Sequence, residues 1–541
     1  MAEEHSSSNQ AGAPLRVLAG PNEPELVFRF AEAAASNGDS AAMCLAAAML
    51  EEGVGTAKDE SRARALYFSA AELGNADAQS YIGCIYARGY GVDVDYRTAA
   101  FWYQKAAGQG NANALNDLGN MHKHGLFFEV NEELAEKYYA SAADLGCADA
   151  KYNLGAHLVR SGRPSEVERG IAELTAAADA GVSKAMTELA GIYVGESVVP
   201  ADFVKAFKFF EAAAVKGDLE GITGLGTCFF RGCGCDRDEV TANQLFAMAA
   251  ERGFSLAQFN LAWSYHHGSG LKQNYDEAFK WYSAAAEQGS SGGIRGLGEL
   301  YELGVGGVSQ DFEKSAGLYM HAAELGDFIA EYNLGVFYEH GMGVPVNRKI
   351  AAEYLERAAK KGHGSAQLNL GLLHLNGIDG VSNFSVAMTW LQLAAKSGNP
   401  KANGAIGKMY LSGQGVEKDI NTAVHYFRLS AEQGDARSQH NLALLFRGVE
   451  GGPIDADESR YWLSRAAHAG FAASQIEMAI MCLANGGFIL DEAEGYKWAV
   501  LGDLNGDPRG KAARRICEER ISKEDLAKGL ALAKDFRNVS S

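Results

Sequence analysis

The sequence lacks the segments that would place a protein in a membrane or export it. No run of about 18 apolar residues occurs in the 541 residues, so no transmembrane helix is expected. The N-terminus, MAEEHSSSNQAGAPL, has neither a basic segment nor an apolar core, so we expect no secretory signal. The eight cysteines do not recur at a fixed spacing, which favours reduced thiols in a cytoplasmic protein.

Positive charge and proline are also scarce. The chain has 49 Lys and Arg against 68 Asp and Glu, and this net charge of −19 repels phosphate backbones and anionic membranes. We therefore expect other proteins as partners, with no nucleic acid and no direct insertion into a membrane. Only 9 prolines occur but 64 glycines do. So many glycines would disrupt helices unless they occupied fixed places.

One glycine recurs at nearly constant spacing through most of the chain. The spacing is 36 residues, with one interval of 35 and one of 37. This period is typical of a solenoid of helical repeats, and it predicts an all-α chain of about 13 tandem helix pairs. We call these residues the phase glycines: Gly38, Gly74, Gly110, Gly146, Gly181, Gly217, Gly253, Gly289, Gly326, Gly362, Gly398, Gly434, Gly470 and Gly506.

Other positions keep the same phase and define two helices per repeat. Ala-Ala precedes twelve of the phase glycines by four and three residues, near the end of the second helix, helix B. The first helix, helix A, carries an aliphatic residue and then Gly or Ala, as in Leu370-Gly371. This small residue should let helix B approach closely, which offsets the cost of roughly 1 kcal/mol for a glycine inside a helix. The phase glycine should end helix B in a left-handed conformation.

The repeat resembles the Sel-one-like repeat (SLR) family, relatives of the tetratricopeptide repeats. Signature runs are AQSYIGCIYARGYGVDVDYRTAAFWYQKAAGQG (78–110) and AEYNLGVFYEHGMGVPVNRKIAAEYLERAAKKG (330–362). The resemblance covers about residues 25–510. It implies a right-handed α/α superhelix of antiparallel helix pairs, with helix A on the concave surface and helix B outside. It also implies a non-enzymatic scaffold or adaptor that binds partner proteins on the helix A surface.

The two ends depart from the repeat pattern. We expect residues 1–24 to form a disordered tail and residues 25–39 a capping helix. The solenoid should cover residues 40–510. Residues 511–541 are predicted to form C-terminal capping helices, which a solenoid needs to cover its last repeat.

No motif for catalysis or cofactor binding stands out. The Gly-x-Gly turns follow helices rather than strands, which argues against phosphate-binding loops. Cys228, Cys233 and Cys235 are close in sequence, but a metal site needs about four ligands and no fourth is adjacent. Three ordinary thiols are the simpler interpretation, and metal binding stays open. We therefore expect no enzyme activity, no cofactor and no metal.

Asparagine recurs in helix A, seven residues after the phase glycine. The family resemblance implies that such an Asn projects into the groove and bonds the backbone of a bound peptide. The alternative is a hydrogen bond to the neighbouring repeat. Trp263, one turn beyond one of these residues, is either a partner anchor or a core residue. We call the set the asparagine ladder: Asn153, Asn260, Asn333, Asn369 and Asn441.

Basic side chains recur at the end of helix A, fourteen residues after the phase glycine. In an acidic protein, such a series could meet acidic side chains of a partner. The alternative is that these cations stabilise the C-terminal end of the helix dipole. We call the set the basic ladder: Arg88, His124, Arg160, Arg231, His267 and His340.

One loop differs from the others. In the third repeat, Leu126, Phe127 and Phe128 replace the glycine loop. They form either an exposed contact site or an apolar plug between helices.

We favour the scaffold hypothesis over two alternatives. One alternative is a regulatory subunit of a membrane-associated or ER quality-control complex, which would require a signal peptide. The other is an enzyme of the cysteine-rich SLR type, whose regular cysteine pairs this sequence lacks.

Overall fold

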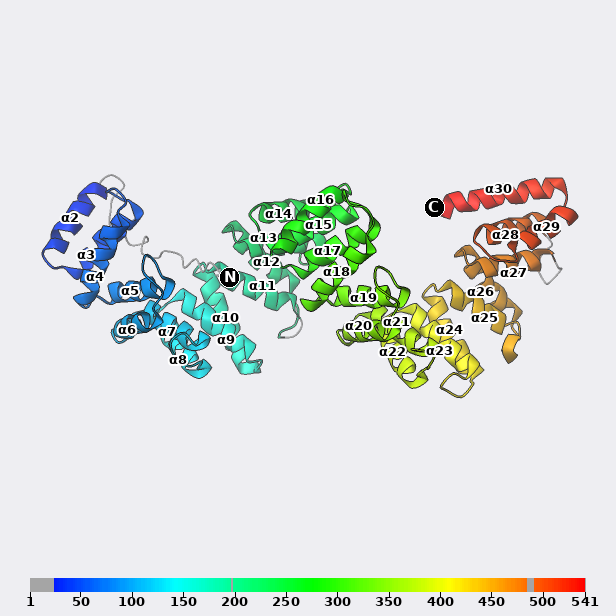
Figure 1. Cartoon of the computed structure of the whole chain (residues 1–541), viewed down its shortest axis with the longest axis horizontal. Helices are drawn as coiled ribbons and strands as arrows, with labels where there is room; N and C mark the ends of the chain where they lie inside the picture. The colour runs from blue at the N-terminus through cyan, green and yellow to red at the C-terminus, as the bar shows by residue number, and fades with distance from the viewer. Residues whose placement is uncertain (1–23, 196–197, 484–490, 541) are drawn as a thin grey trace. The chain divides into compact units, whose positions relative to one another are not determined.

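The computed structural model describes residues 24–195, 198–483 and 491–540. Within these residues the chain forms 29 α-helices, one short 3-10 helix (Val449–Gly451) and two isolated β-bridges. The predicted all-α solenoid of tandem helix pairs is confirmed (Figure 1). None of the described helices is long and apolar enough to cross a membrane.

Thirteen helix pairs follow a single helix, α2 (Pro24–Ser36), and precede α29 (Gly510–Arg520) and α30 (Lys523–Ser540). The helices A are α3 (Ser40–Glu52), α5 (Ala76–Arg88), α7 (Ala112–His124), α9 (Ala148–Arg160), α11 (Ser183–Val194), α13 (Leu219–Arg231), α15 (Ser255–His267), α17 (Ser291–Leu303), α19 (Phe328–His340), α21 (Gly364–Asn376), α23 (Pro400–Ser412), α25 (Ala436–Leu445) and α27 (Ala472–Leu483). The helices B are α4 (Glu60–Glu72), α6 (Tyr96–Ala107), α8 (Glu132–Asp144), α10 (Pro164–Asp179), α12 (Phe203–Val215), α14 (Glu239–Glu251), α16 (Tyr275–Glu287), α18 (Phe312–Glu324), α20 (Arg348–Lys360), α22 (Phe384–Lys396), α24 (Ile420–Glu432), α26 (Ala456–His468) and α28 (Glu492–Leu504).

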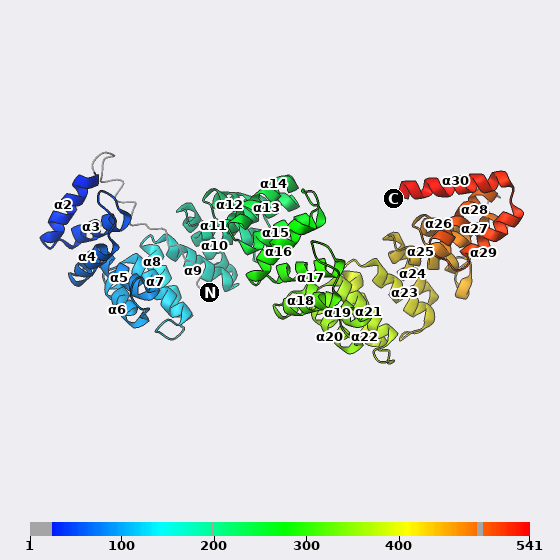
Figure 2. The same ribbon diagram turned by 45° about the horizontal axis from the view of Figure 1, so that its top comes forward.

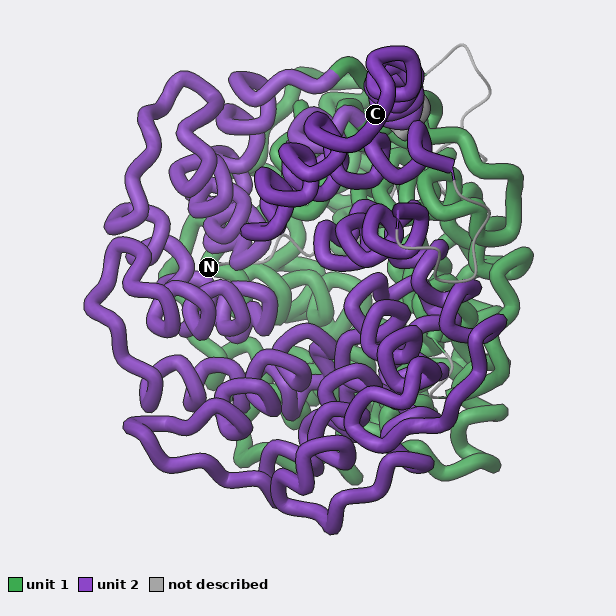
Figure 3. The backbone as a smooth tube through the Cα atoms, turned by 90° about the vertical axis from the view of Figure 1, so that its right-hand side faces the viewer, with its two compact units in different colours: residues 1–261, 269–272 green, residues 262–268, 273–541 purple. Residues whose placement is uncertain are grey.

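The helices fall into two compact units, which Figure 3 colours separately. The first comprises Met1–Leu261 and Ser269–Lys272, and the second comprises Ala262–Gly268 and Gln273–Ser541. Within each unit, consecutive helices lie beside one another in chain order (Figures 1 and 2). Each helix therefore contacts mainly its neighbours in sequence, as expected for a repeat array.

The phase glycines end helix B as predicted. All fourteen have a positive φ, between +78° and +96°, a region that is costly for residues with a Cβ. The residue after the phase glycine then caps the next helix A in most repeats. Asn75, for example, follows Gly74, and its side chain accepts a hydrogen bond from the Ala78 amide. Two adjacent residues thus stop one helix and start the next.

The small residue inside helix A allows a large side chain of helix B to lie directly against its backbone. A Cβ at Gly119 would lie 2.6 Å from the ring of Tyr139, and one at Gly298 would lie 2.7 Å from the ring of Tyr319. Both tyrosine side chains are fully buried. The predicted close approach is confirmed, and the same contact recurs at Gly83–Tyr103, Gly226–Phe246, Gly335–Leu355 and Gly371–Leu391.

Two kinds of hydrogen bond recur between neighbouring repeats, each at some of the junctions. Glutamines five residues after a phase glycine donate to a carbonyl at the end of the preceding helix B: Gln79 to Ala71, Gln258 to Ala250, Gln367 to Ala359, Gln439 to Ala431 and Gln475 to Ala467. The residue just before a phase glycine donates to the carbonyl of the preceding phase glycine: Gln109 to Gly74, Arg252 to Gly217, Lys361 to Gly326 and Asn505 to Gly470. We call both sets the junction bonds.

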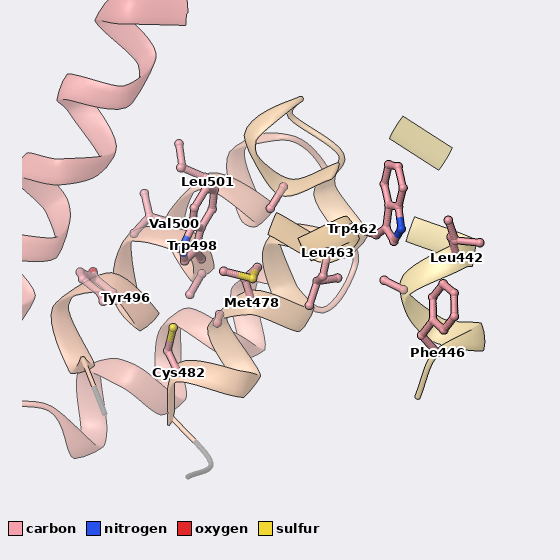
Figure 4. Close-up of a cluster of buried hydrophobic side chains, with 14 of the residues drawn as sticks. Leu442, Phe446, Trp462, Leu463, Met478, Cys482, Tyr496, Trp498, Val500 and Leu501 are labelled. Carbon is pink, nitrogen blue, oxygen red and sulfur yellow. The ribbon is translucent and has the colours of Figure 1, made fainter. Parts of the chain in front are cut away.

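The two ends of the array share the cores of the adjacent pairs. Phe28, Ala31 and Ala35 of α2 are buried in one cluster with residues of α3 and α4. At the other end, Cys517 of α29 and Ala533 of α30 join the cluster around Trp498, part of which Figure 4 shows. Most of the predicted tail, residues 1–24, lies outside the described residues. We propose that α2, α29 and α30 act as caps.

Replacing Gly298 with Val should destabilise the chain by about 1–3 kcal/mol, because the new Cβ would lie 2.7 Å from the Tyr319 ring. Gly317→Ala is the matched control, since a Cβ on this helix glycine meets nothing within 4 Å. It should stabilise α18 by up to about 1 kcal/mol. Urea unfolding followed by circular dichroism measures both effects. Equal midpoints for the two variants would contradict the close-approach argument.

Candidate functional site

The asparagine ladder lies where the sequence predicts, in the middle of helices A. Its residues belong to α9, α15, α19, α21 and α25, and all five are half-buried. Each of these residues is therefore partly accessible to solvent. Trp263 of α15 is also half-buried, so its exposure lies between that expected of a partner anchor and that expected of a core residue.

Asn153 is hydrogen-bonded to the preceding repeat. Its amide nitrogen donates to Asn116 Oδ1 at 2.8 Å and lies 3.5 Å from Asn120 Oδ1. Asn120 Oδ1 also accepts a hydrogen bond of 2.8 Å from the Tyr139 hydroxyl. This network joins α9 to α7 in the preceding repeat. For this member of the ladder, a bond to the neighbouring repeat is present.

Asp117 occupies the same register in α7, seven residues after Gly110, and a pattern of asparagines alone does not predict it. Burial raises the pKa of its carboxyl to about 6. Hydrogen bonds from Tyr103 and Asn120 and the charge of Arg88 act in the opposite direction. The register therefore accepts a carboxyl group as well as an amide.

Every residue of the basic ladder is the last residue of its helix A, and all six are exposed. This position favours a cation electrostatically, because the helix C-terminus carries partial negative charge. His267 contacts a residue of its own helix. Its Nδ1 lies 3.0 Å from the Trp263 carbonyl oxygen, and its ring stacks on the Trp263 ring with 4.1 Å between the ring centroids. Arg88 donates to the Tyr90 hydroxyl at 3.3 Å.

A charged cluster lies between α17 and α19, and it was not predicted. Arg295 Nε donates to Asp327 Oδ2 at 3.2 Å, and Arg295 also pairs with Glu299. Burial raises the pKa of Glu299, against the effect of Arg295. Burial, together with the charges of His267 and Arg295, lowers the pKa of His266 to about 4. His266 is therefore a neutral, buried side chain near pH 7.

The three clustered cysteines are free thiols. Cys228 is buried in α13, and Cys233 and Cys235 are half-buried in the following loop. Burial, with a smaller effect from the other two thiols, raises the pKa of Cys228 to about 12, so its reactive thiolate is disfavoured. Within the described ranges, no three His, Cys, Asp or Glu side chains are grouped so that they could hold a metal ion.

The Sel1 repeat matches the chain eleven times, over more than half of its length: residues 40–75, 76–111, 112–147, 183–218, 219–254, 255–290, 293–327, 329–363, 364–399, 400–435 and 436–471. The chain belongs to the Sel1 repeat family. The pair α9–α10 lies between two matched stretches and is itself unmatched, yet this Sel1 repeat protein keeps the helix pair there.

Several solved structures are similar to this Sel1 repeat protein. A protective antigen of uropathogenic Escherichia coli strains, which displays an SLR fold, is 25% identical over 94% of each chain, with a TM-score of 0.53. A Sel1 repeat protein from Oxalobacter formigenes is 31% identical over 45% of this chain and 96% of its own, with a TM-score of 0.39. Yeast Tom70 is 15% identical over 78% of this chain and 99% of its own, with a TM-score of 0.34. No curated protein matches the chain.

Replacing Asp117 with Asn should stabilise the protein at neutral pH. Because the folded pKa of about 6 lies above the usual range near 4, the folded state holds the proton more tightly. The free energy of unfolding therefore falls as pH rises through this window. Asp117→Asn should raise it at pH 7.5 by on the order of 2 kcal/mol and change it little at pH 4.

Thermal melting at the two pH values measures the effect. Asp117→Ala is the control, because it removes the charge and the hydrogen-bond acceptor together. It should lower the melting temperature at pH 4, where the carboxyl of the parent protein is neutral. An equal gain for Asp117→Asn at both pH values would contradict the role of ionisation.

Proposed function

We propose that this Sel1 repeat protein is a non-enzymatic scaffold that binds extended segments of other proteins across its helices A. The observation that carries the proposal is the recurrence of polar side chains at fixed positions of successive helices A. The half-buried amides of the asparagine ladder repeat at one register and the exposed cations of the basic ladder at another. Such a surface offers hydrogen bonds that are separated by whole numbers of repeats along the array.

The chemistry of the two ladders indicates the kind of segment that would bind. An Asn side chain offers both a donor and an acceptor, so it can bond a peptide backbone without selecting its sequence. Exposed Arg and His side chains in an acidic chain favour acidic side chains of the partner. We therefore propose an extended backbone held by the amides, with its carboxylates toward the basic ladder.

We also propose that the protein works in the cytoplasm. All eight cysteines are free thiols, three of them buried. A reducing compartment keeps thiols in this state, whereas an oxidising one favours disulfides.

Replacing Asn333 and Asn369 together with Ala should weaken partner binding by about tenfold or more, with nearly unchanged helicity and melting temperature. Affinity capture of the full chain with mass spectrometry first identifies the bound proteins. Calorimetric titration with the bound segment of such a protein then compares the variants.

Asn153→Ala is the matched control. Its amide bonds Asn116 in the preceding repeat, so its loss should lower the melting temperature. If Asn333→Ala/Asn369→Ala also lowered melting and left affinity unchanged, the ladder would be structural throughout and the proposal would be wrong.

A further inference from the structure

The loop after α7 combines both arrangements predicted for its apolar residues. Leu126 and Phe128 are half-buried and pack against the core formed by α6 and α7. Phe127 points the other way: 51% of its surface is exposed, and its φ is +68°. An exposed aromatic residue in the left-handed region is unfavourable on two counts, solvation and backbone conformation.

Glycine occupies the corresponding position in most other repeats, for a steric reason. A Cβ at Gly234 would lie 2.1 Å from the Phe203 carbonyl oxygen, and one at Gly343 would lie 2.1 Å from the Phe312 carbonyl oxygen. Phe127 therefore replaces a residue that most repeats keep small. Its left-handed conformation is unfavourable for a residue with a Cβ, and a strained residue of this kind points to a functional reason.

A second exception lies on α6. Phe101 of α6 is also 51% exposed and packs edge-on against Trp102 at 5.3 Å. It lies nine residues before Gly110, and the equivalent residue in most other repeats is polar: Lys137, Lys208, Gln244, Lys280, Glu353, Thr389, His425 and Lys497. Helix B of the second repeat and the loop of the third thus each expose one aromatic ring, and Tyr461 is a further exposed ring at the register of Phe101.

Two cations accompany these rings. Arg97 lies over the Phe127 ring at 5.8 Å, and Lys105 lies over the Phe101 ring at 4.5 Å. Arg97, Phe101 and Lys105 are spaced four residues apart on α6, so they share one stripe of the helix. All three are exposed, and neither cation forms an ion pair with any part of the chain that the structure describes.

We propose that Arg97, Phe101, Lys105 and Phe127 form a second docking site, which binds an acidic segment of a partner protein through an aromatic or aliphatic anchor. We call these four residues the aromatic–basic patch. The anchor packs on the two rings, and carboxylates on either side of it pair with the two cations. In a chain with a net charge of −19, two exposed cations that form no direct ion pair within the described residues fit an acidic segment, although the charge of Arg97 also acts on the nearby Asp95 carboxylate.

The patch is separate from the helix A surface. Its residues come from helix B of the second repeat and the loop of the third, whereas the two ladders lie on helices A. The proposal therefore does not depend on the scaffold function proposed above, and one site can fail while the other holds.

Fluorescence anisotropy with the full chain tests the proposal. The probe is a fluorescein-labelled synthetic peptide of twelve residues, mostly Asp and Glu, with Phe and Leu four residues apart. It should bind, and Phe127→Gly should weaken binding by about tenfold or more. Arg97→Glu/Lys105→Glu should weaken it further, and added salt should lower the affinity. A peptide with Lys in place of each Asp and Glu should not bind.

Two controls separate docking from folding. Phe127→Gly removes strain at a positive φ, so its melting temperature should equal or exceed that of the parent chain. Phe30→Ala removes another exposed phenylalanine, 69% accessible on α2, and should leave the affinity unchanged. The proposal is overturned if the acidic peptide does not bind the parent chain, if Phe127→Gly binds equally well or melts lower, or if Phe30→Ala loses as much affinity.

Discussion

The contact between a small residue of helix A and a large side chain of helix B sets the geometry of each repeat. Where Gly119 faces Tyr139 or Gly298 faces Tyr319, the ring lies against the helix backbone and is fully buried. The loss of a Cβ weakens helix A locally, and the buried ring offsets this cost with dispersion and hydrophobic free energy. The distance between the paired helices follows from this contact.

Much of the fold could be predicted because its determinants are local and repeated. A phase glycine acts within four residues of itself, so its left-handed conformation can be inferred from the sequence around it. Fourteen copies of the same signal also exclude chance. The junction bonds could not be predicted from the sequence, although five glutamines share one register. Their acceptors are backbone carbonyls, which any residue would offer. The charged cluster around Arg295 could not be predicted either, because it occurs once and joins residues about 30 positions apart.

The helices and registers of the two ladders could be predicted from sequence, but the hydrogen bonds of their side chains could not. The asparagine ladder and the basic ladder lie in the helices and registers predicted for them. Whether a given amide is already bonded depends on the side chain one repeat away. Asn153 meets Asn116 there, and Asp117 is buried strongly enough to hold its proton near pH 6. A single register thus contains groups that stabilise the array as well as groups proposed to bind a partner.

The junction bonds have a consequence for how the array transmits force. Each bond connects neighbouring repeats, as the bond from Gln109 to Gly74 does across 35 residues. In a linear array of repeats, a force applied to the two ends acts equally on every junction. Each junction extends independently of the others, because each repeat contacts only its neighbours. A pull on the ends would open the weakest junction first and leave distant repeats intact. For the same reason, ligands seated several repeats apart would occupy their positions independently, so total occupancy would add up without cooperativity.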